Sequence, residues 1–261
     1  MRSWLSRLPG FTIWRCIVDA MHCLDLGVYQ VLVACALCEM SSEHIWLGDN
    51  QDERLLAGYA QYKIWCKGQD VEPCHRFDLK KIKGKGDACP AFTQHQAKAS
   101  QTRYLVRWIS SVLDGHGAVG RHAILRRRLF SSWCEFENVL DRNGRFLPAA
   151  EVELQTRHCE NALVCQRALR DDALDEGSTH WHWLPKNHLA THLSFDHAAR
   201  CNPRVVHAYA DEDLAGRMKR PLHRAHGLTF GRIAPLRYII LAGVRWWDRL
   251  APIRNVRDLF G

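Results

Sequence analysis

The segment that decides the fold is MHCLDLGVYQVLVACALCEM, which occupies residues 21–40. A helix built from it is apolar on nearly every face, as expected of a helix that is buried on all sides. Residues 11–18, FTIWRCIV, come directly before it and are rich in β-branched and aromatic side chains, which favours a strand leading into Asp19. The first 45 residues therefore predict a strand followed by a core helix.

Helical spacing of apolar residues continues through most of the remaining chain. Asn50 and Glu53 have the spacing of a capping box and mark the start of the next helix. Residues 68–92, which are rich in Gly, Pro, Lys and Asp, predict a loop. Further helices are expected around residues 105–112, 125–140, 148–172, from 185 onward, 211–220 and 236–251. The pattern predicts a mainly α protein, a helical domain with one or two β-strands near the N-terminus.

The composition is that of an ordinary globular protein. Of the 261 residues, 47% are hydrophobic and 25% are charged, which argues against a mainly disordered chain. The longest uninterrupted apolar run, residues 31–38, is shorter than the roughly 20 residues of a membrane span, so we expect a soluble intracellular protein with no membrane partner. The eleven cysteines lack a framework spacing and are expected to be thiols.

We expect a single domain over residues 1–261. Its parts would be a strand–helix core over residues 1–45, a helical insertion-like part over 46–175, and a His-rich and Arg-rich C-terminal part over 176–261. No internal repeat or low-complexity segment divides the sequence.

Basic side chains are concentrated at the C-terminal end. The chain has 36 Lys+Arg against 28 Asp+Glu, a formal net charge of +8, and residues 200–261 hold 12 of the basic and 5 of the acidic residues. Arginine suits bidentate phosphate contacts, so this excess permits a DNA partner. The candidate contacts to the DNA backbone are Arg217, Lys219, Arg220, Arg224, Arg245 and Arg249.

Three short motifs have a simpler structural interpretation than a binding one. Residues 115–120, GHGAVG, fit the dinucleotide-binding glycine pattern, but no parallel strands flank them, which favours a helix–helix connection. The four lysines between residues 80 and 85 are expected on a solvated loop, with contact to a phosphate backbone as the alternative. Cys35 and Cys38 lie in the apolar helix, which favours core packing over a zinc site.

Two acidic clusters carry a more specific hypothesis. Asp19 follows the expected strand, with His22 three residues later, and residues 211–213 are Asp-Glu-Asp at an expected helix start. Each has a structural alternative, because Asp19 can be a helix N-cap and the second cluster can interact with a helix dipole. If the fold brings them together, they can hold two divalent metals that activate water and stabilise the leaving oxygen in phosphoryl transfer.

Five histidines lie between residues 180 and 197, and two of them have the spacing of a helix face. His188 and His192 are four residues apart, which places them on one side of the expected helix. This spacing suits either a metal site or a pair of partly buried, hydrogen-bonded side chains.

Three blocks of the sequence resemble a known family. Residues 19–28, DAMHCLDLGV, resemble the Asp-x-Met-His-x-x-x-Leu-Gly-Val block of plavaka-like and CACTA-like transposases, which belong to the DDE superfamily of eukaryotic cut-and-paste elements. Residues 183–193, WLPKNHLATHL, are similar to the Lys-x-His-x-x-x-His block that follows in such proteins. Asn202, Pro203 and residues 209–216, YADEDLAG, look like the block after that.

The resemblance implies an RNase H-like catalytic core with a large helical insertion. It also implies that an acidic triad holds Mg²⁺ or Mn²⁺ and that the protein cleaves and joins DNA strands. It assigns Asp19 and His22 to the catalytic Asp-x-x-His signature and implies that Asp19 is also a metal ligand. It makes Glu212 the best candidate for the final acidic ligand, with Asp211 and Asp213 as rivals. The residues expected to support the metal ligands are Lys186, His188 and His192.

The sequence departs from the family at one point. The family has an acidic residue on an earlier strand, whereas residues 1–18 contain neither Asp nor Glu. We therefore expect a C-terminal piece of a transposase-like protein, truncated or decayed, in which residues 1–45 are a remnant of the RNase H-like core. It would bind DNA in the nucleus, with strand cleavage and joining incomplete or lost. The alternatives are a helical interaction module without catalysis and a metal-dependent hydrolase that uses His188 and His192.

Overall fold

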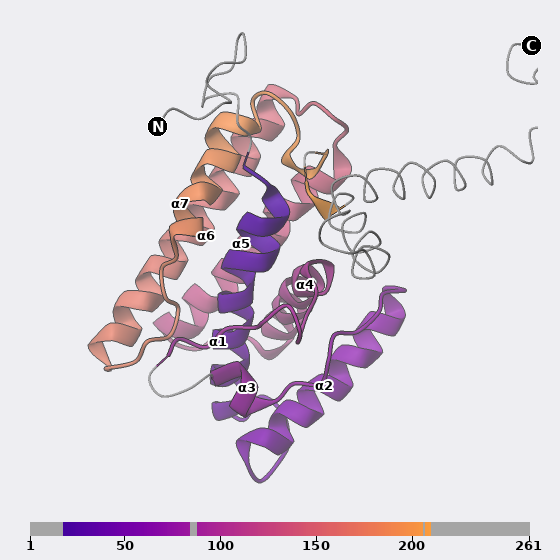
Figure 1. Cartoon of the computed structure of the whole chain (residues 1–261). Helices are drawn as coiled ribbons and strands as arrows, with labels where there is room; N and C mark the ends of the chain where they lie inside the picture. Colours follow the sequence, from indigo (N-terminus) through magenta and orange to yellow (C-terminus); the bar gives the residue numbers. More distant parts are fainter. Residues whose placement is uncertain (1–17, 84–87, 206, 210–261) are drawn as a thin grey trace, which may run out of the picture. The chain divides into compact units, whose positions relative to one another are not determined.

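The computed structural model describes residues 18–83, 88–205 and 207–209 (Figure 1). Contacts divide the chain into two compact units, residues 1–207 and 208–261, and the elements below belong to the first. The described residues are mainly helical and contain no strand, which confirms the predicted helical character. The expected strand over residues 11–18, apart from Val18 itself, and the helices expected after residue 210 lie outside the described residues. The RNase H-like remnant and the single domain stay predictions.

Ten helical elements follow one another in the described residues. Seven are α-helical, η3 and η4 are π-helical, and η5 is a 3₁₀ turn. In chain order they are η3 (Met21–Val28), α1 (Tyr29–Ser42), α2 (Gln51–Gly68), α3 (Leu79–Lys83), α4 (Ala99–His116), α5 (Arg121–Arg142), α6 (Ala149–Asp175), α7 (Pro185–His192), η4 (Leu193–His197) and η5 (Pro203–Val205).

The predicted core helix corresponds to η3 and α1, which follow each other directly and are called the core rod below. The other helices are arranged around this rod (Figure 1). It contacts α2, α3, α4 and α7, and Cys35 and Cys38 are buried in it as predicted. Residues Met21–Ser42 are long enough to cross a membrane, and an 18-residue window within them has a mean hydropathy of 1.6. In this structure 89% of that window is buried against the rest of the protein.

The antiparallel pair α5 and α6 forms the largest helix–helix contact in the described residues. The predicted stripe on α5 is buried, with Leu129, Trp133 and Phe136 at 0% exposure. Trp133 meets Tyr29 of α1 edge to face with ring centroids 5.3 Å apart, which anchors the core helix on this pair. Helix α6 starts directly after Pro148, as the sequence predicts.

Helix α2 begins at the predicted cap. The Asn50 side chain accepts the backbone N–H of Glu53 at 3.0 Å, and the Glu53 carboxylate accepts from the Asn50 side-chain amide at 2.9 Å. The expected loop over residues 68–92 is partly wrong, because it contains the short helix α3. Asp78 accepts the backbone N–H of Lys81 at the start of α3, and Ile82 is fully buried, so one cap and one apolar anchor suffice to order this turn.

The glycine-rich motif at residues 115–120 is a helix–helix connection between α4 and α5, as expected. Gly117 and Gly120 adopt φ values of 71° and 86°, a backbone region that favours glycine. The glycines therefore serve the reversal of the chain between two helices.

Candidate functional site

Two of the blocks that resemble the transposases pack directly against each other, although about 160 residues separate them. Lys186 at the start of α7 lays its aliphatic stem across Gly27, and its Nζ donates to the Leu26 carbonyl at 2.7 Å. A Cβ at position 27 would lie 2.2 Å from Lys186 Cδ. Cys23 Sγ donates to the Lys186 carbonyl at 3.3 Å. The glycine of the first block and the lysine of the second are thus a matched pair.

The backbone explains why a carbonyl is available to Lys186. η3 is π-helical, and the chain leaves helical geometry at Leu26, where φ is −99° and ψ is 21°. Such local irregularities within helices redirect backbone groups toward side-chain partners. The Leu26 carbonyl is therefore satisfied by a charged donor from a distant element.

Asp19 is engaged at the start of this rod. Its carboxylate accepts the backbone N–H groups of Met21 and His22, each at 3.2 Å, and it also contacts His22 Nδ1. The first turn of a helix has N–H groups without helical partners, and a carboxylate there is favourable. Asp19 therefore has the capping contacts that its structural alternative predicts, and His22 is its direct neighbour.

The other predicted catalytic and DNA-binding residues lie outside the described residues. These are Asp211, Glu212, Asp213, Arg217, Lys219, Arg220, Arg224, Arg245 and Arg249. The predicted approach of Glu212 to Asp19 consequently stays a prediction. Within residues 18–83, 88–205 and 207–209, no group of three or more His, Cys, Asp and Glu side chains is arranged to hold a metal ion.

The three residues expected to support the metal ligands behave differently. Lys186 contacts the block at residues 19–28, as described above. His188 and His192 contact each other on α7, with 3.1 Å between their Nε2 atoms. His192 Nδ1 lies 2.6 Å from the Asp196 carboxylate.

Asn202, from the third block, has a structural role in the described residues. Its side chain is fully buried and its amide donates to the carbonyls of Leu140 at 2.8 Å and Gly144 at 3.0 Å, at the C-terminal end of α5. Its backbone N–H donates to the Arg145 carbonyl at 2.8 Å. Carbonyls at a helix end lack helical partners, so Asn202 closes the end of α5.

A buried ionic network next to this cap was not anticipated from the sequence. Glu137 of α5 is 1% exposed, accepts from the Tyr29 hydroxyl at 2.8 Å and pairs with Arg204 Nη2 at 2.5 Å. Arg204 also pairs with Asp141 at 2.6 Å. Burial lowers the pKa of Arg204, but the carboxylates of Glu137 and Asp141 outweigh it and raise that pKa, so the guanidinium stays charged.

A second network surrounds Glu39, the first carboxylate after Asp25 in the core rod. It accepts from Trp181 Nε1 at 2.6 Å and Arg126 Nη1 at 2.9 Å, and it lies 3.0 Å from His122 Nε2 and 3.4 Å from His180 Nδ1. Burial raises the pKa of Glu39, but hydrogen bonds from His122 and His180 outweigh it and lower the pKa to about 2. A carboxylate inside an otherwise apolar helix is the sequence signal for such a network.

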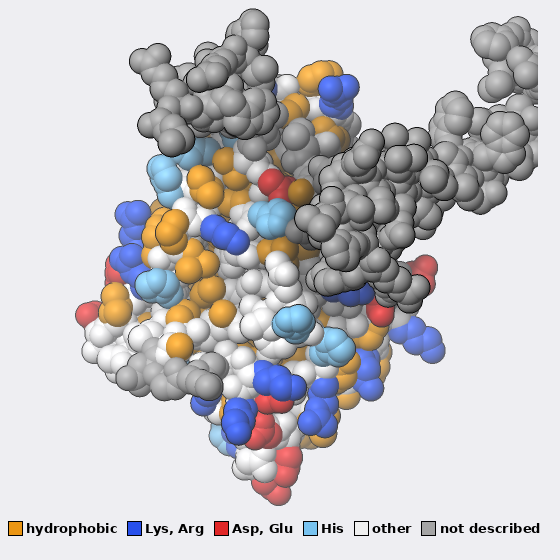
Figure 2. Space-filling model, in the orientation of Figure 1, with side chains coloured by type: hydrophobic (Ala, Val, Ile, Leu, Met, Phe, Trp, Pro, Cys, Tyr) orange, Lys and Arg blue, Asp and Glu red, His pale blue; other side chains and the backbone are white. Residues whose placement is uncertain are grey.

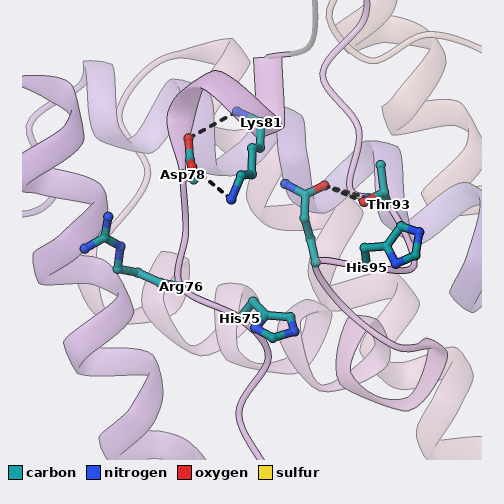
Figure 3. A pocket seen from close by; sticks show the side chains of 7 residues that line it. His75, Arg76, Asp78, Lys81, Thr93 and His95 are labelled. Atoms are coloured by element: carbon teal, nitrogen blue, oxygen red, sulfur yellow. Dashed lines mark hydrogen bonds and ion pairs between the residues drawn. The ribbon is translucent and has the colours of Figure 1, made fainter.

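The described surface also has a pocket of about 540 Å³ beside α3 (Figure 3). It is lined by His75, Arg76, Asp78, Lys81, Thr93, His95 and Gln96. Asp78 pairs with Lys81 at 3.3 Å, and the Gln96 amide oxygen accepts from Thr93, which fixes the opposite wall. Basic side chains outnumber the one acidic side chain, so the pocket suits an anion.

Protein-family models, curated proteins and solved structures give no match to this chain. The resemblance of the three blocks to transposases therefore stays a prediction.

The distribution of charge separates the described residues from the rest of the chain. Residues 18–83, 88–205 and 207–209 hold 22 Lys+Arg and 22 Asp+Glu. Residues 1–17 and 210–261 hold 13 Lys+Arg and 5 Asp+Glu, which accounts for the whole net charge of +8. Accordingly, basic and acidic side chains are interspersed on the face seen in Figure 2. A cationic DNA contact is thus expected mainly from the segments outside the described residues.

Proposed function

We propose that the chain is a transposon-derived, transposase-like protein that binds DNA, with metal-dependent strand cleavage and joining incomplete or lost. The observation that carries this proposal is the contact between two of the resembling blocks through Gly27 and Lys186. A glycine and a lysine at these positions have a physical reason only if the two blocks form one unit. That is the arrangement expected if both belong to one ancestral core.

The proposed DNA contact is electrostatic. The basic excess of residues 210–261, which includes Arg217, Lys219 and Arg220, supports binding to a phosphate backbone. Such contacts set affinity and carry no sequence information by themselves. The lysines of α3 and the neighbouring basic pocket offer a secondary contact to the same phosphates.

Salt dependence tests this proposal. The full chain is titrated with a DNA duplex between 50 and 300 mM salt, together with R217Q/K219Q/R220Q and the control R121Q/R127Q/R157Q, which removes equal charge from exposed sites on α5 and α6. We expect a steep loss of affinity with salt for the wild type, with a slope that is smaller by about 0.9 for each phosphate contact removed in the first variant. The control should keep the wild-type slope. Weak binding that does not respond to salt would contradict the proposal.

The retained chemistry is tested separately with Mn²⁺. If an active site survives, Mn²⁺ should raise the melting temperature of the full chain, because a metal that binds only the folded protein stabilises it. Asp19→Asn should remove that rise together with any Mn²⁺-dependent nicking of supercoiled DNA. Asp175→Asn, at an exposed carboxylate at the end of α6, is the control and should leave both readouts unchanged.

A helical interaction module without catalysis is the second candidate, and one observation favours it. The Asp19 carboxylate is used by the N–H groups of Met21 and His22, a role that needs no metal. This candidate predicts no change of melting temperature with Mn²⁺ and no salt-dependent binding to DNA. The salt titration separates it from the first candidate, because the first also includes a chain whose metal chemistry is lost.

A further inference from the structure

The two histidines of α7, of which His188 is exposed and His192 half-buried, form a pair whose ring nitrogens face each other. His188 and His192 are one helical turn apart, with Nε2 atoms 3.1 Å apart and ring planes at 83°. Histidine side chains reach the surface over α7 in the space-filling view (Figure 2). Two imidazole nitrogens that share one divalent metal at about 2.0–2.1 Å each lie roughly 3 Å apart, so the observed spacing already suits a chelate.

Asp196 settles which nitrogen of His192 is available. His192 Nδ1 lies 2.6 Å from an Asp196 carboxylate oxygen, so Nδ1 carries the proton and donates to it. In neutral His192 the lone pair is then on Nε2, the atom that faces His188. A carboxylate behind a histidine in this way fixes the ring and raises its basicity as a metal ligand.

The pair also lies next to open space. His188 lines a pocket of about 660 Å³ between α6, α7 and η4, with Trp183, Arg167 and Phe195 among its other walls. Arg167 covers the Trp183 ring at 5.3 Å. A metal at the pair would therefore be reached from solvent, and water would fill its remaining coordination positions.

We propose that His188 and His192 form a two-histidine chelate for a divalent transition metal of the Ni²⁺, Cu²⁺ or Zn²⁺ type, with Asp196 as the residue that orients His192. Imidazole is a good ligand for these ions. Because His192 Nε2 is the acceptor, the 3.1 Å contact places the proton of His188 on its Nε2. On binding, the metal takes the place of this proton between the two Nε2 atoms, and neutral His188 changes tautomer, with its single proton moved to Nδ1 by exchange with solvent. The site does not depend on the proposed function, since it uses neither Asp19 nor DNA.

Calorimetric titration of the full, reduced chain with NiCl₂ tests the site. Ni²⁺ is the probe because it prefers imidazole, whereas Zn²⁺ would also be bound by the cysteines. We expect one Ni²⁺ per chain at the strongest site, binding at least tenfold more weakly in His188→Gln and in His192→Gln, and about tenfold more weakly in Asp196→Ala. His182→Gln, at an exposed histidine just before α7, is the control and should bind like the wild type. Equal affinity in the wild type and both histidine variants would overturn the proposal.

A spectroscopic readout on the wild type protects the test against a variant that fails to fold. One equivalent of Cu²⁺, added after the accessible thiols have been alkylated so that they neither bind nor reduce it, should give an electron paramagnetic resonance spectrum with coupling to the nitrogens of two imidazoles. His188→Gln should reduce this to one. A spectrum of the wild type without coupling to two imidazoles would refute the chelate, whatever the variants do.

Discussion

At the scale of single residues, the most specific finding is the fit between Gly27 and Lys186. The side chain of any residue other than glycine at position 27 would meet the Lys186 stem and, at 3.1 Å, the His22 carbonyl. A flexible lysine stem can move, but it would then lose the hydrogen bond to the Leu26 carbonyl. One methyl group is therefore enough to disturb the contact between two distant blocks.

Gly27→Ala should lower the free energy of unfolding by about 1–3 kcal/mol, the usual cost of overpacking. The cost should be smaller when Lys186→Ala is already present, because the clash with the stem is then gone. Chemical denaturation of the two single variants and the double variant measures this coupling. Gly115→Ala is the control: a Cβ there meets nothing within 4 Å, so it should be neutral or slightly stabilising. Additive effects of the two changes would contradict the contact.

The cysteine thiols also differ in reactivity at the scale of single residues. Most of the described cysteines are expected to be unreactive because they are buried. Burial raises the pKa of Cys134 to about 11, whereas a hydrogen bond with Cys35 lowers the pKa of Cys89 to about 7. Both thiols are half-buried, so their rates of modification can be compared at similar exposure. The Cys89 Sγ lies 4.0 Å from Cys35 Sγ.

Native labelling with iodoacetamide at pH 7.5 should modify Cys89 at least about tenfold faster than Cys134, because the thiolate is the reacting form. Peptide mass spectrometry over a time course gives the two rates. In Cys35→Ala, the rate at Cys89 should fall toward that of Cys134, since the side-chain donor to the thiolate is removed. Equal rates at the two cysteines in the wild type would show that the Cys35 contact does not activate Cys89.

At the scale of helices, Glu39 joins the core rod to α5 and to the segment before α7. Its partners are Arg126 and His122 from α5, and Trp181 from the segment before α7. Hydrogen bonding to Glu39 raises the pKa of His122, although burial lowers it. The two groups therefore stabilise each other while Glu39 is negative and His122 is positive.

This network predicts how stability changes with pH. The pKa of Glu39 is lowered from 4.5 to about 2 on folding, so its contribution is present above pH 4.5 and is lost as pH falls toward 2. The pKa of His122 is raised above 6.5, so its contribution is present below pH 6.5 and is lost as pH rises through the raised value. The network should stabilise the protein most between about pH 4.5 and 6.5.

Urea denaturation from pH 3 to 8 tests this, with Glu39→Gln as the variant. The wild type should lose stability toward pH 3 more steeply than Glu39→Gln, by roughly 2–3 kcal/mol over the acidic range. Glu72→Gln is the control, since that carboxylate is exposed and should change the acid profile little. Parallel profiles of the wild type and Glu39→Gln would exclude a depressed pKa at Glu39.

At the scale of the whole molecule, the described residues and the basic excess are separate. The described residues balance 22 basic with 22 acidic side chains, whereas residues 210–261 alone hold 10 basic and 5 acidic. Residues 1–207 form a compact unit by contacts. Stability and DNA affinity are therefore expected to depend on different parts of the chain.

Removal of residues 210–261 should leave the melting temperature within a few degrees of that of the full chain and should abolish salt-dependent DNA binding. Thermal denaturation and DNA titration of the two forms provide the measurements. Retained DNA affinity in the shorter form would show that the described residues bind DNA. The pocket lined by Arg76 and Lys81 would then be the first candidate for that contact.

Much of the helical structure was predictable because its causes are local. The cap at Asn50, the stripe on α5 and the apolar rod at residues 21–40 all depend on neighbours within one or two helical turns. The short helix α3 was missed because a single cap and the single anchor Ile82 are too weak a pattern among Gly, Pro and Lys.

The sequence by itself determined that the chain is mainly helical, that residues 21–40 are buried, and that His188 and His192 share a helix face. Only the tertiary structure decided that Lys186 lies on Gly27, that Glu39 collects partners from two other elements, and that Asn202 closes the end of α5. The physical reason is how far apart the interacting residues lie in the sequence. Helical periodicity is a pattern among residues three or four positions apart. A contact between residues 60 to 160 positions apart depends instead on how the assembled helices fill space and satisfy their buried polar groups.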